Sequence, residues 1–388
     1  MEPGFHLVEM LVANNGLFHS YTIMFDDNEQ VRWYMDMSSA GKICYSPLRL
    51  RNGNWLYLSW IDIYELDELG KVINKDQMWG NAGDHDIIEL ENGNLLMGGS
   101  KKDAMVVRDG QPVVTRYDHI VEWDRNPPTK TARDWDLGAV LDIDRSVFPA
   151  DYSLDNKADW FHINSISFDP KANSLWASGR NQGVVKLNQQ GKLQWILSPH
   201  KDWGSAGRSG RGTDTRPFLL TAVDASGKPY PDNVQEGTTP AEDFEWTTGQ
   251  HAINILDNGN IVLFDNGLSR NFETTPSYSR AVEYEIDEEA KTIKQVWQYG
   301  KERGLDMFSG ITSDVDILSE TGNRLITAGN VRLGELPPHA KMVEITYPDN
   351  EVVFEANLFF KDLSGTGARS WAQFDLVYRG ERYPLYAD

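Results

Sequence analysis

Cysteine is nearly absent from this chain of 388 residues. Cys44 is the only one, so an intrachain disulfide cannot form. The residues around it, Lys42, Ile43 and Tyr45, are typical of a β-strand. That setting favours a small buried hydrophobic side chain over a reactive thiol.

Long apolar runs are missing too. No stretch is long and apolar enough to cross a membrane. The first residues, Met1-Glu2-Pro3-Gly4-Phe5, lack the charged segment and the apolar run of a signal peptide. We therefore expect either a cytoplasmic protein or the mature or truncated form of an exported one.

Positively charged residues are fewer than negatively charged ones. The chain has 37 Lys and Arg and 58 Asp and Glu, which gives a formal net charge of −21. This balance argues against a nucleic acid or an anionic membrane as partner, since both need a basic patch. It does not exclude an anionic small molecule in a locally basic pocket.

Three common signatures are also absent. The chain has no P-loop and no Gly-x-Ser-x-Gly nucleophile elbow. Gly365-Thr366-Gly367-Ala368 is too short for a dinucleotide fingerprint. We expect no cofactor.

What the chain does have is a recurring turn signal between apolar runs. Asn-Gly tolerates positive φ at both central residues, which tight hairpins need. The five copies are Asn52-Gly53-Asn54, Asn92-Gly93-Asn94, Ala172-Asn173-Ser174, Asn258-Gly259-Asn260 and Thr321-Gly322-Asn323. With 33 Gly and 13 Trp, this pattern indicates a large β-rich core with many tight turns.

A second hairpin signal alternates with the first. In it, an apolar strand ends in Asp, Asn or Glu, turns, and resumes into an aromatic or aliphatic run. Its six copies turn near Asp26, Asp67, Asp124, Asn188, Asp287 and Thr346. Two hairpins per unit make a four-stranded antiparallel sheet, and six units predict an all-β fold, a six-bladed β-propeller. We expect a single domain over residues 1–388, whose terminal strands pair in one blade. The sixth inner hairpin is then degenerate or split across the chain ends.

One segment interrupts this rhythm. Residues 203–248 are rich in Gly, Pro, Ser, Thr and Asp, and they precede His251. The segment is either a solvated surface insertion or a loop over one mouth of the propeller.

Three histidines occupy corresponding places in the repeat. The position seven residues before the first turn signal holds Tyr45, His85, His251 and Asp314, and the surrounding pattern places His162 there as well. The first strand of each blade lines the propeller channel, so these residues are expected to meet at one end of it. The remaining histidines, His6, His19, His119, His200 and His339, fall outside this register, and we expect structural roles for them.

Arg180 ends the strand that follows the His162 strand, so antiparallel pairing should return it to that histidine. Its planar guanidinium matches the oxygens of a carboxylate, phosphate or sulfate. Asn164, two residues after His162, should face the same side of its strand.

Three kinds of function suit these residues. The histidines could bind zinc or another metal, with Asp84, Asp86 or Asp314 as further ligands, in a hydrolase or lyase. An arginine beside a metal is electrostatically costly, however, unless an anion lies between them. Without a metal, one neutral imidazole could attack a transferable anionic group while the cations hold its oxygens. A non-catalytic propeller that binds an anion or a protein is the third alternative.

At this point the chain resembles a family, the bacterial arylsulfate sulfotransferases. The resemblance covers nearly the whole chain. It rests on Asp159-Trp160-Phe161-His162-Ile163-Asn164-Ser165, Ser178-Gly179-Arg180-Asn181-Gln182, Gly249-Gln250-His251-Ala252-Ile253 and Tyr378-Arg379-Gly380-Glu381-Arg382-Tyr383-Pro384-Leu385-Tyr386.

The resemblance implies transfer of a sulfuryl group from an aryl sulfate to a phenol by a ping-pong route, without an adenylyl-sulfate cofactor or a metal. It implies that His251 becomes sulfated, while His162, Arg180 and His85 hold sulfate oxygens and assist the leaving phenol. Asn164 would be a further contact, and Tyr378 would line the aryl site. The aromatic residues Trp160, Phe244, Trp246 and Phe308 could contribute to an aryl pocket, or pack between blades.

The chain departs from the family pattern in its ends. Many members carry an export signal and a small N-terminal β-sandwich domain, and we expect neither within residues 1–388. Some carry a disulfide, which one cysteine cannot provide. The resemblance implies a periplasmic protein, with a cytoplasmic one as the alternative, and it leaves formation of a homodimer open.

Overall fold

A computed structural model describes residues 1–14, 17–37, 44–78, 82–108, 111–126, 128–145, 159–208, 210–359 and 375–383. The predictions made for residues 42–43, 365–368 and 384–386 lie outside these ranges. The chain divides into two compact units. Unit 1 consists of Met1–Gln77, Tyr278–Ala281 and Tyr299–Asp388, and unit 2 of Met78–Ser277 and Val282–Gln298.

Unit 1 holds three four-stranded sheets. The first has the order β25-β1-β2-β3, from β25 (Leu376–Tyr383), β1 (Phe5–Asn14), β2 (Leu17–Phe25) and β3 (Val31–Asp36). The second contains β4 (Tyr45–Arg49), β5 (Trp55–Ser59), β6 (Asp62–Leu66) and β7 (Val72–Gln77). The third contains β21 (Asp314–Ile317), β22 (Arg324–Val331), β23 (His339–Ile345) and β24 (Val352–Phe359).

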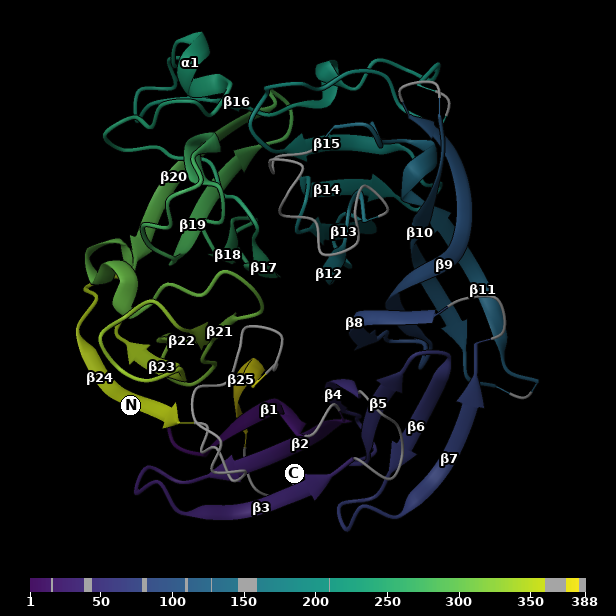
Figure 1. The fold of residues 1–388 in the computed structure, drawn as a ribbon, viewed down its shortest axis with the longest axis vertical. Helices are drawn as coiled ribbons and strands as arrows, with labels where there is room; N and C mark the ends of the chain where they lie inside the picture. Colours follow the sequence, from purple (N-terminus) through teal and green to yellow (C-terminus); the bar gives the residue numbers. More distant parts are fainter. Residues whose placement is uncertain are drawn as a thin grey trace. The chain divides into compact units, whose positions relative to one another are not determined.

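Unit 2 holds the other three sheets, apart from the ends of β19 and β20 (Figure 1). One contains β8 (Ala82–Glu89), β9 (Leu95–Arg108), β10 (Gln111–Asp124) and β11 (Lys130–Asp136). The next contains β12 (Ile163–Asp169), β13 (Ser174–Gly179), β14 (Gly183–Asn188) and β15 (Leu193–Leu197). The last has the order β16-β20-β19-β18-β17, from β16 (Thr221–Ala222), β17 (His251–Ile255), β18 (Ile261–Asp265), β19 (Arg280–Asp287) and β20 (Thr292–Tyr299).

The two hairpin signals lie where the sequence predicts them. The Asn-Gly type joins the first and second strands of a sheet, as in the turn between β8 and β9, and the other type joins the third and fourth, as between β14 and β15. These six sheets of antiparallel neighbours are those of a six-bladed β-propeller, which confirms the predicted fold class. The single domain over residues 1–388 stays a prediction.

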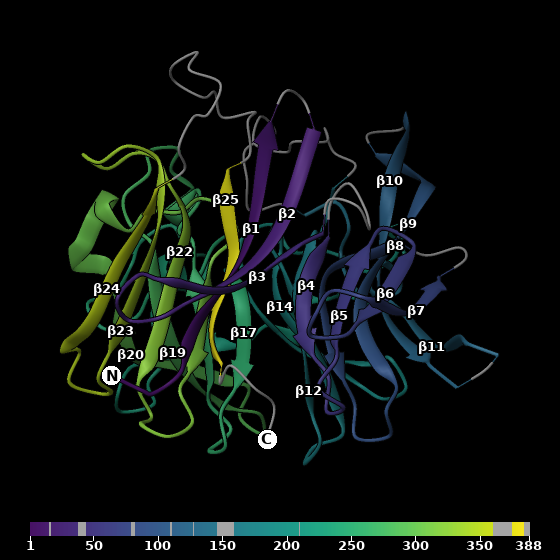
Figure 2. The same ribbon diagram turned by 90° about the horizontal axis from the view of Figure 1, so that it is seen from below.

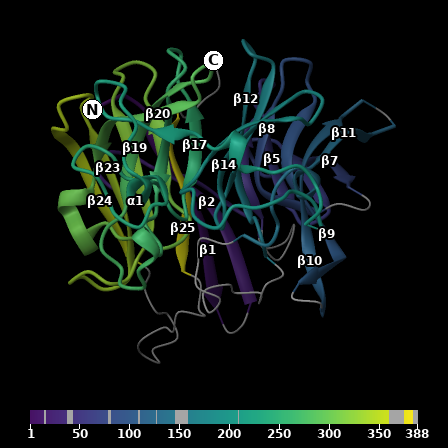
Figure 3. The same cartoon turned by 90° about the horizontal axis from the view of Figure 1, so that it is seen from above.

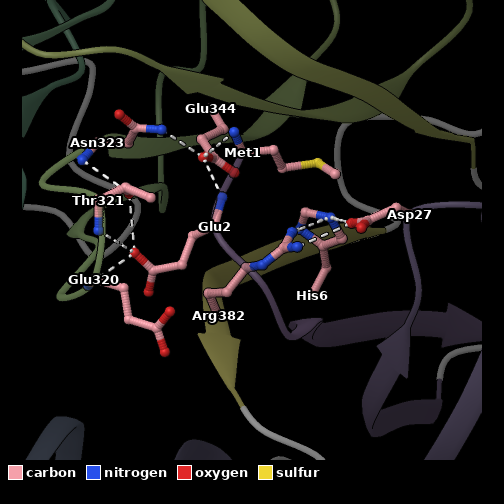
Figure 4. Close-up of polar contacts among 9 residues, drawn as sticks. All are labelled: Met1, Glu2, His6, Asp27, Glu320, Thr321, Asn323, Glu344 and Arg382. Atoms are coloured by element: carbon pink, nitrogen blue, oxygen red, sulfur yellow. Dashed lines mark hydrogen bonds and ion pairs between the residues drawn. The ribbon is translucent and has the colours of Figure 1, made fainter.

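The sixth inner hairpin is split across the chain ends. β25, from the C-terminal part, pairs antiparallel with β1 (Figure 2). In this pairing His6 lies opposite Arg382. Nη1 of Arg382 lies 2.6 Å from Nε2 of His6, and Oδ1 of Asp27 lies within 3.1 Å of His6 and 3.0 Å of Arg382 (Figure 4). The predicted pairing of the terminal strands is therefore confirmed, and a buried polar cluster joins them.

The segment 203–248 does more than cover the surface. It contributes β16, which pairs parallel to β20 and adds a fifth strand to that sheet, and the short helix α1 (Asp232–Gln235). Its apolar residues Leu220, Val234, Phe244 and Trp246 are buried in a core cluster of unit 2. The description of the whole segment as a solvated insertion is thus too simple, because its apolar side chains pack on the sheet. Its place over a propeller mouth stays a prediction.

Cys44 is buried, with 3% of its surface exposed. Burial raises the pKa of its thiol to about 12. A group so rarely ionised near neutral pH is a poor nucleophile, which agrees with a packing role.

The histidines outside the register have structural partners. His6 contacts Asp27 and Arg382, His119 contacts Asp134, His200 contacts the Leu220 carbonyl, His339 contacts the Pro337 carbonyl, and His19 stacks on Tyr21. Among the described residues, no helix is both long and apolar enough to span a membrane.

Candidate functional site

Three neighbouring inner strands of unit 2 carry the aligned histidines. β12 contacts both β8 and β17, and the strands appear together in Figures 1 and 3. Side chains near the strand starts connect them. The bonds are Ile166 N to Asp86 Oδ2 at 2.7 Å, Ile253 N to Ser165 Oγ at 3.0 Å and Asn164 Nδ2 to the Gln250 carbonyl at 2.6 Å. The segments that hold His85, His162 and His251 are therefore fixed to one another.

The backbone is irregular where these strands begin. His85 and His162 adopt φ of 54° and 59°, and Ala252, next to His251, adopts 55°. Left-handed conformations are uncommon for residues other than glycine, and bulges of this kind redirect side chains next to functional sites. His85 lies inside the bulge of β8, whereas His251 pairs with Phe264 just before the bulge of β17. The histidines therefore lie at the same end of their strands, as predicted, but they do not occupy equivalent positions in the strand pairing.

The predicted site residues of unit 2 come together. The rings of His85 and His162 lie 4.9 Å apart between centroids. The backbone N–H of Arg180 donates to the His162 carbonyl at 3.0 Å, so the strand return predicted for Arg180 is confirmed. Arg180, His162 and His85 lie near enough to His251 that positive charge on them lowers its pKa. Tyr378 lies on β25 and Asp314 on β21, both in unit 1, and the role of Tyr378 stays a prediction.

Close packing explains how Arg180 reaches His162. Gly179 precedes Arg180, and a Cβ atom at Gly179 would lie 2.6 Å from the ring of Phe161, which precedes His162. Only glycine permits this approach of the two segments. The peptide of Asn181 continues the pairing, because its N–H donates to the Phe161 carbonyl at 3.1 Å.

His251 is held in one orientation. Its Nδ1 lies 2.7 Å from Oδ1 of Asn266 and 3.0 Å from the Gly249 carbonyl oxygen. Burial lowers the pKa of His251 well below its ordinary value, and the positive charge of Arg180 and the rings of His162 and His85 lower it further. The Asn266 contact opposes this effect only in part. His251 is therefore a neutral imidazole near neutral pH.

His162 has a different partner. Its Nδ1 lies 2.5 Å from Oδ2 of Asp159, and the same oxygen lies 3.5 Å from Nη2 of Arg180. Burial and then Arg180 lower the pKa of His162, while Asp159 raises it. The backbone carbonyl of Asp159 accepts a bond from Asn181 Nδ2 at 2.5 Å, which holds the backbone that carries the carboxylate.

This arrangement suits an oxyanion. Arg180 is 6% exposed and supplies a guanidinium beside two imidazoles, and its Nη2 contacts the carboxylate of Asp159. Donors held in a site of low water content stabilise charge on oxygen strongly, because they need no reorganisation. Within the described residues, no group of three or more His, Cys, Asp or Glu is placed to hold a metal ion.

Two residues of the site, Asp159 and Asn266, were not predicted to have a role in it. Asp159 precedes His162 by three residues, which a search for a carboxylate partner could have noticed. Asn266 follows the end of β18, and only strand pairing brings it to His251. The candidate aromatic residues Trp160, Phe244 and Trp246 are buried in the cores of unit 2, which agrees with packing roles.

Comparison with known proteins gives the same family as the motifs. The sequence model of the arylsulfotransferase (ASST) family matches residues 1–363. The chain is 30% identical to the arylsulfate sulfotransferase AssT of Escherichia coli, covering 87% of this chain and 62% of that protein. It is 31% identical to AssT of Lelliottia amnigena, with the same two coverages of 87% and 62%.

The chain thus spans less than two thirds of the length of these curated relatives. A solved structure of a Bacteroides caccae protein of unknown function covers 97% of this chain and 98% of its own, with a TM-score of 0.52 and 11% identity. That likeness concerns the fold alone. The match of the family model over nearly the whole chain is what decides the question, and it shows that this chain belongs to the arylsulfotransferase family.

Proposed function

We propose that this chain is an aryl sulfotransferase, which moves a sulfuryl group from an aryl sulfate to a phenol through a sulfohistidine at His251. The observation that carries the proposal is the state of His251. Its Nδ1 faces two oxygen acceptors, at 2.7 and 3.0 Å, so the ring proton resides there. The lone pair of the neutral ring is then on Nε2, where it can attack sulfur.

In the first half-reaction, Nε2 of His251 forms a bond to sulfur and the bond from sulfur to the aryl oxygen breaks. The electron pair of that bond goes to the leaving oxygen. A phenol has a pKa of about 10, so the leaving oxygen benefits from a proton. His162 is the proposed donor, because Asp159 at its Nδ1 and the bound anionic ester both favour its protonated form.

The non-transferred oxygens of the sulfuryl group are the proposed ligands of Arg180 and His85, with Asn164 as a further contact. Arg180 can offer two parallel N–H bonds to such oxygens. Nη2 of Arg180 lies 3.5 Å from Asp159 and its Nε donates to Oδ1 of Asn181 at 3.3 Å, so these two contacts orient the guanidinium.

The second half-reaction reverses the first. The oxygen of the acceptor phenol attacks sulfur, the bond from sulfur to Nε2 breaks, and its electron pair returns to His251. The phenol proton passes to His162, which restores the starting state. No adenylyl-sulfate cofactor and no metal enter either step. Tyr378 is proposed to line the aryl site, and the periplasm is the proposed location, both from the family resemblance.

Family membership supports this proposal, because the two relatives are named as arylsulfate sulfotransferases. Initial-rate kinetics test it. With a chromogenic aryl sulfate as donor and an unrelated phenol as acceptor, double-reciprocal plots should be parallel. Turnover should survive a chelator and disappear in His251→Ala. Intersecting lines, or activity that a chelator abolishes, would contradict the proposal.

A further inference from the structure

We propose that Asn266 is a positioning residue, whose side-chain carbonyl holds His251 as the neutral tautomer with its proton on Nδ1 and its lone pair on Nε2. The inference rests on the proposed function, since it takes His251 as the attacking group. Asn266 is not expected to touch the substrate. It acts through the orientation and the protonation state of His251.

The tautomer follows from chemistry that does not depend on how the amide of Asn266 is oriented. A backbone carbonyl can only accept a hydrogen bond, and the Gly249 oxygen lies 3.0 Å from Nδ1. Nδ1 must therefore carry the proton. The side-chain oxygen of Asn266, at 2.7 Å, is the shorter of the two acceptors. Gly249 can turn its carbonyl to the ring because it adopts φ of 69°.

The backbone on both sides of this contact is rigidly held. Gly267 N donates to the Thr248 carbonyl at 2.9 Å. The carboxylate of Asp265 accepts from Thr248 N at 3.0 Å, Gly267 N at 3.2 Å and Arg270 Nη1 at 2.8 Å. Asp265 and Asn266 have no exposed surface. These hydrogen bonds thus hold Asn266 next to the segment that precedes His251.

The neighbouring histidine shows why an amide is needed at this point. Burial and Arg180 lower the pKa of His162, and its carboxylate partner Asp159 offsets part of this effect, which suits a group that exchanges a proton. His251 faces an uncharged amide. A carboxylate here would favour the imidazolium form, in which Nε2 has no lone pair to attack with. It would also draw the Nδ1 proton from the sulfohistidine, and a ring without that proton is a poorer leaving group.

The test compares three variants by the pH dependence of kcat/KM. Asn266→Asp keeps the size of the side chain and adds a charge, so the acid limb of the profile should move up by one unit or more. Activity at a pH on that limb should fall by at least about tenfold, because each pH unit changes the neutral fraction tenfold. Asn266→Ala should lower kcat on the order of 10- to 100-fold, the usual effect of removing a partner that orients a histidine.

Asn258→Asp is the matched control. Asn258 lies in the exposed turn between β17 and β18, so the substitution makes the same change in charge on the same sheet. Its profile should coincide with that of the wild type. An unmoved acid limb in Asn266→Asp, or an equal shift in Asn258→Asp, would overturn the proposal.

A second readout does not need turnover. In protein labelled with ¹⁵N-histidine, the signals of His251 are identified by their loss in His251→Ala. Two-bond proton–nitrogen couplings should show Nδ1 protonated and Nε2 unprotonated, and Asn266→Ala should weaken that preference. If the wild type transfers no sulfuryl group, the proposed function fails, and this spectrum still decides the role of Asn266. An Nε2-protonated ring would overturn it.

Discussion

The carboxylate of Asp159 lies 2.5 Å from Nδ1 of His162, and the same oxygen contacts Arg180 at 3.5 Å. One acidic side chain therefore contacts two groups of the site. One is the ring that is proposed to exchange a proton, and the other is the cation that is proposed to hold the sulfuryl oxygens. Removal of its charge should affect the two groups differently, because the contact with His162 is the shorter one.

We predict that Asp159→Asn lowers the pKa of His162 further, since Asp159 is what raises it. Proton delivery to the leaving oxygen should weaken. The loss in kcat/KM should reach about 100-fold for donors whose phenol has a high pKa, and should be much smaller for acidic phenols. Rates measured over a series of aryl sulfates give this dependence as the slope of log kcat/KM against the pKa of the leaving phenol.

Asp169→Asn is the control for that series. Asp169 ends β12 and its carboxylate caps the backbone N–H groups of Lys171 and Ala172, away from His162 along the strand. Its slope should match that of the wild type. Equal losses of Asp159→Asn for all leaving groups would argue that Asp159 has only a structural role.

Arg180 is predicted to act through the two parallel N–H donors of its planar guanidinium and not through its charge alone. Arg180→Lys keeps the charge, loses the two parallel donors, and should reduce kcat/KM about tenfold or more. Arg180→Ala should cost on the order of 10²- to 10³-fold, as expected for a lost donor to a developing charge. Arg216→Lys, at an exposed ion pair with Asp214, is the control. Full activity of Arg180→Lys would be inconsistent with a bidentate contact.

The contact between Gly179 and Phe161 is predicted to hold the site together. A Cβ atom at Gly179 would meet the Phe161 ring at 2.6 Å, so Gly179→Ala should destabilise the protein by about 1–3 kcal/mol, the usual cost of overpacking. It should also lower activity by displacing Arg180. Addition of Phe161→Leu should recover part of both losses, as measured by urea unfolding and by initial rates. No recovery would place the damage elsewhere.

Stability should fall on the acid side because of buried neutral histidines. Burial, and next Arg382, lower the pKa of His6 from 6.5 to about 4. Between these values the unfolded chain binds more protons than the folded one, so the free energy of unfolding decreases as pH falls from 6.5 toward 4. The contribution of His6 is on the order of 1–3 kcal/mol. Urea unfolding from pH 7 to 4.5 measures it, and His6→Gln should flatten the curve. An unchanged curve in that variant would exclude His6 as the source.

The repeat pattern carries much of this structure in its local sequence. Asn-Gly turns select tight hairpins whatever surrounds them, so turns such as Asn92-Gly93-Asn94 and the strands beside them could be predicted. The meeting of His85 and His162 was expected from the repeat register, and the return of Arg180 to His162 from strand direction. These are consequences of chemistry within a few residues of each position.

What could not be predicted depends on contacts between distant segments. His85 lies inside the bulge of β8, whereas His251 lies just before the bulge of β17. These bulges arise where strand pairing is interrupted, and no local sequence pattern marks them. Asn266 reaches His251 across a strand pair, 15 residues apart in sequence. The packing of Phe244 and Trp246 inside segment 203–248 was hidden by its polar composition.

The central claim is that His251 carries the sulfuryl group between donor and acceptor. The most direct measurement is to incubate the protein with an aryl sulfate in the absence of acceptor, quench it under alkaline conditions, and weigh the proteolytic peptides. We predict one modified peptide, heavier by one sulfuryl group at His251, which disappears when a phenol is added before the quench. An unmodified His251 peptide, in protein that still releases phenol when an acceptor is present, would contradict the account.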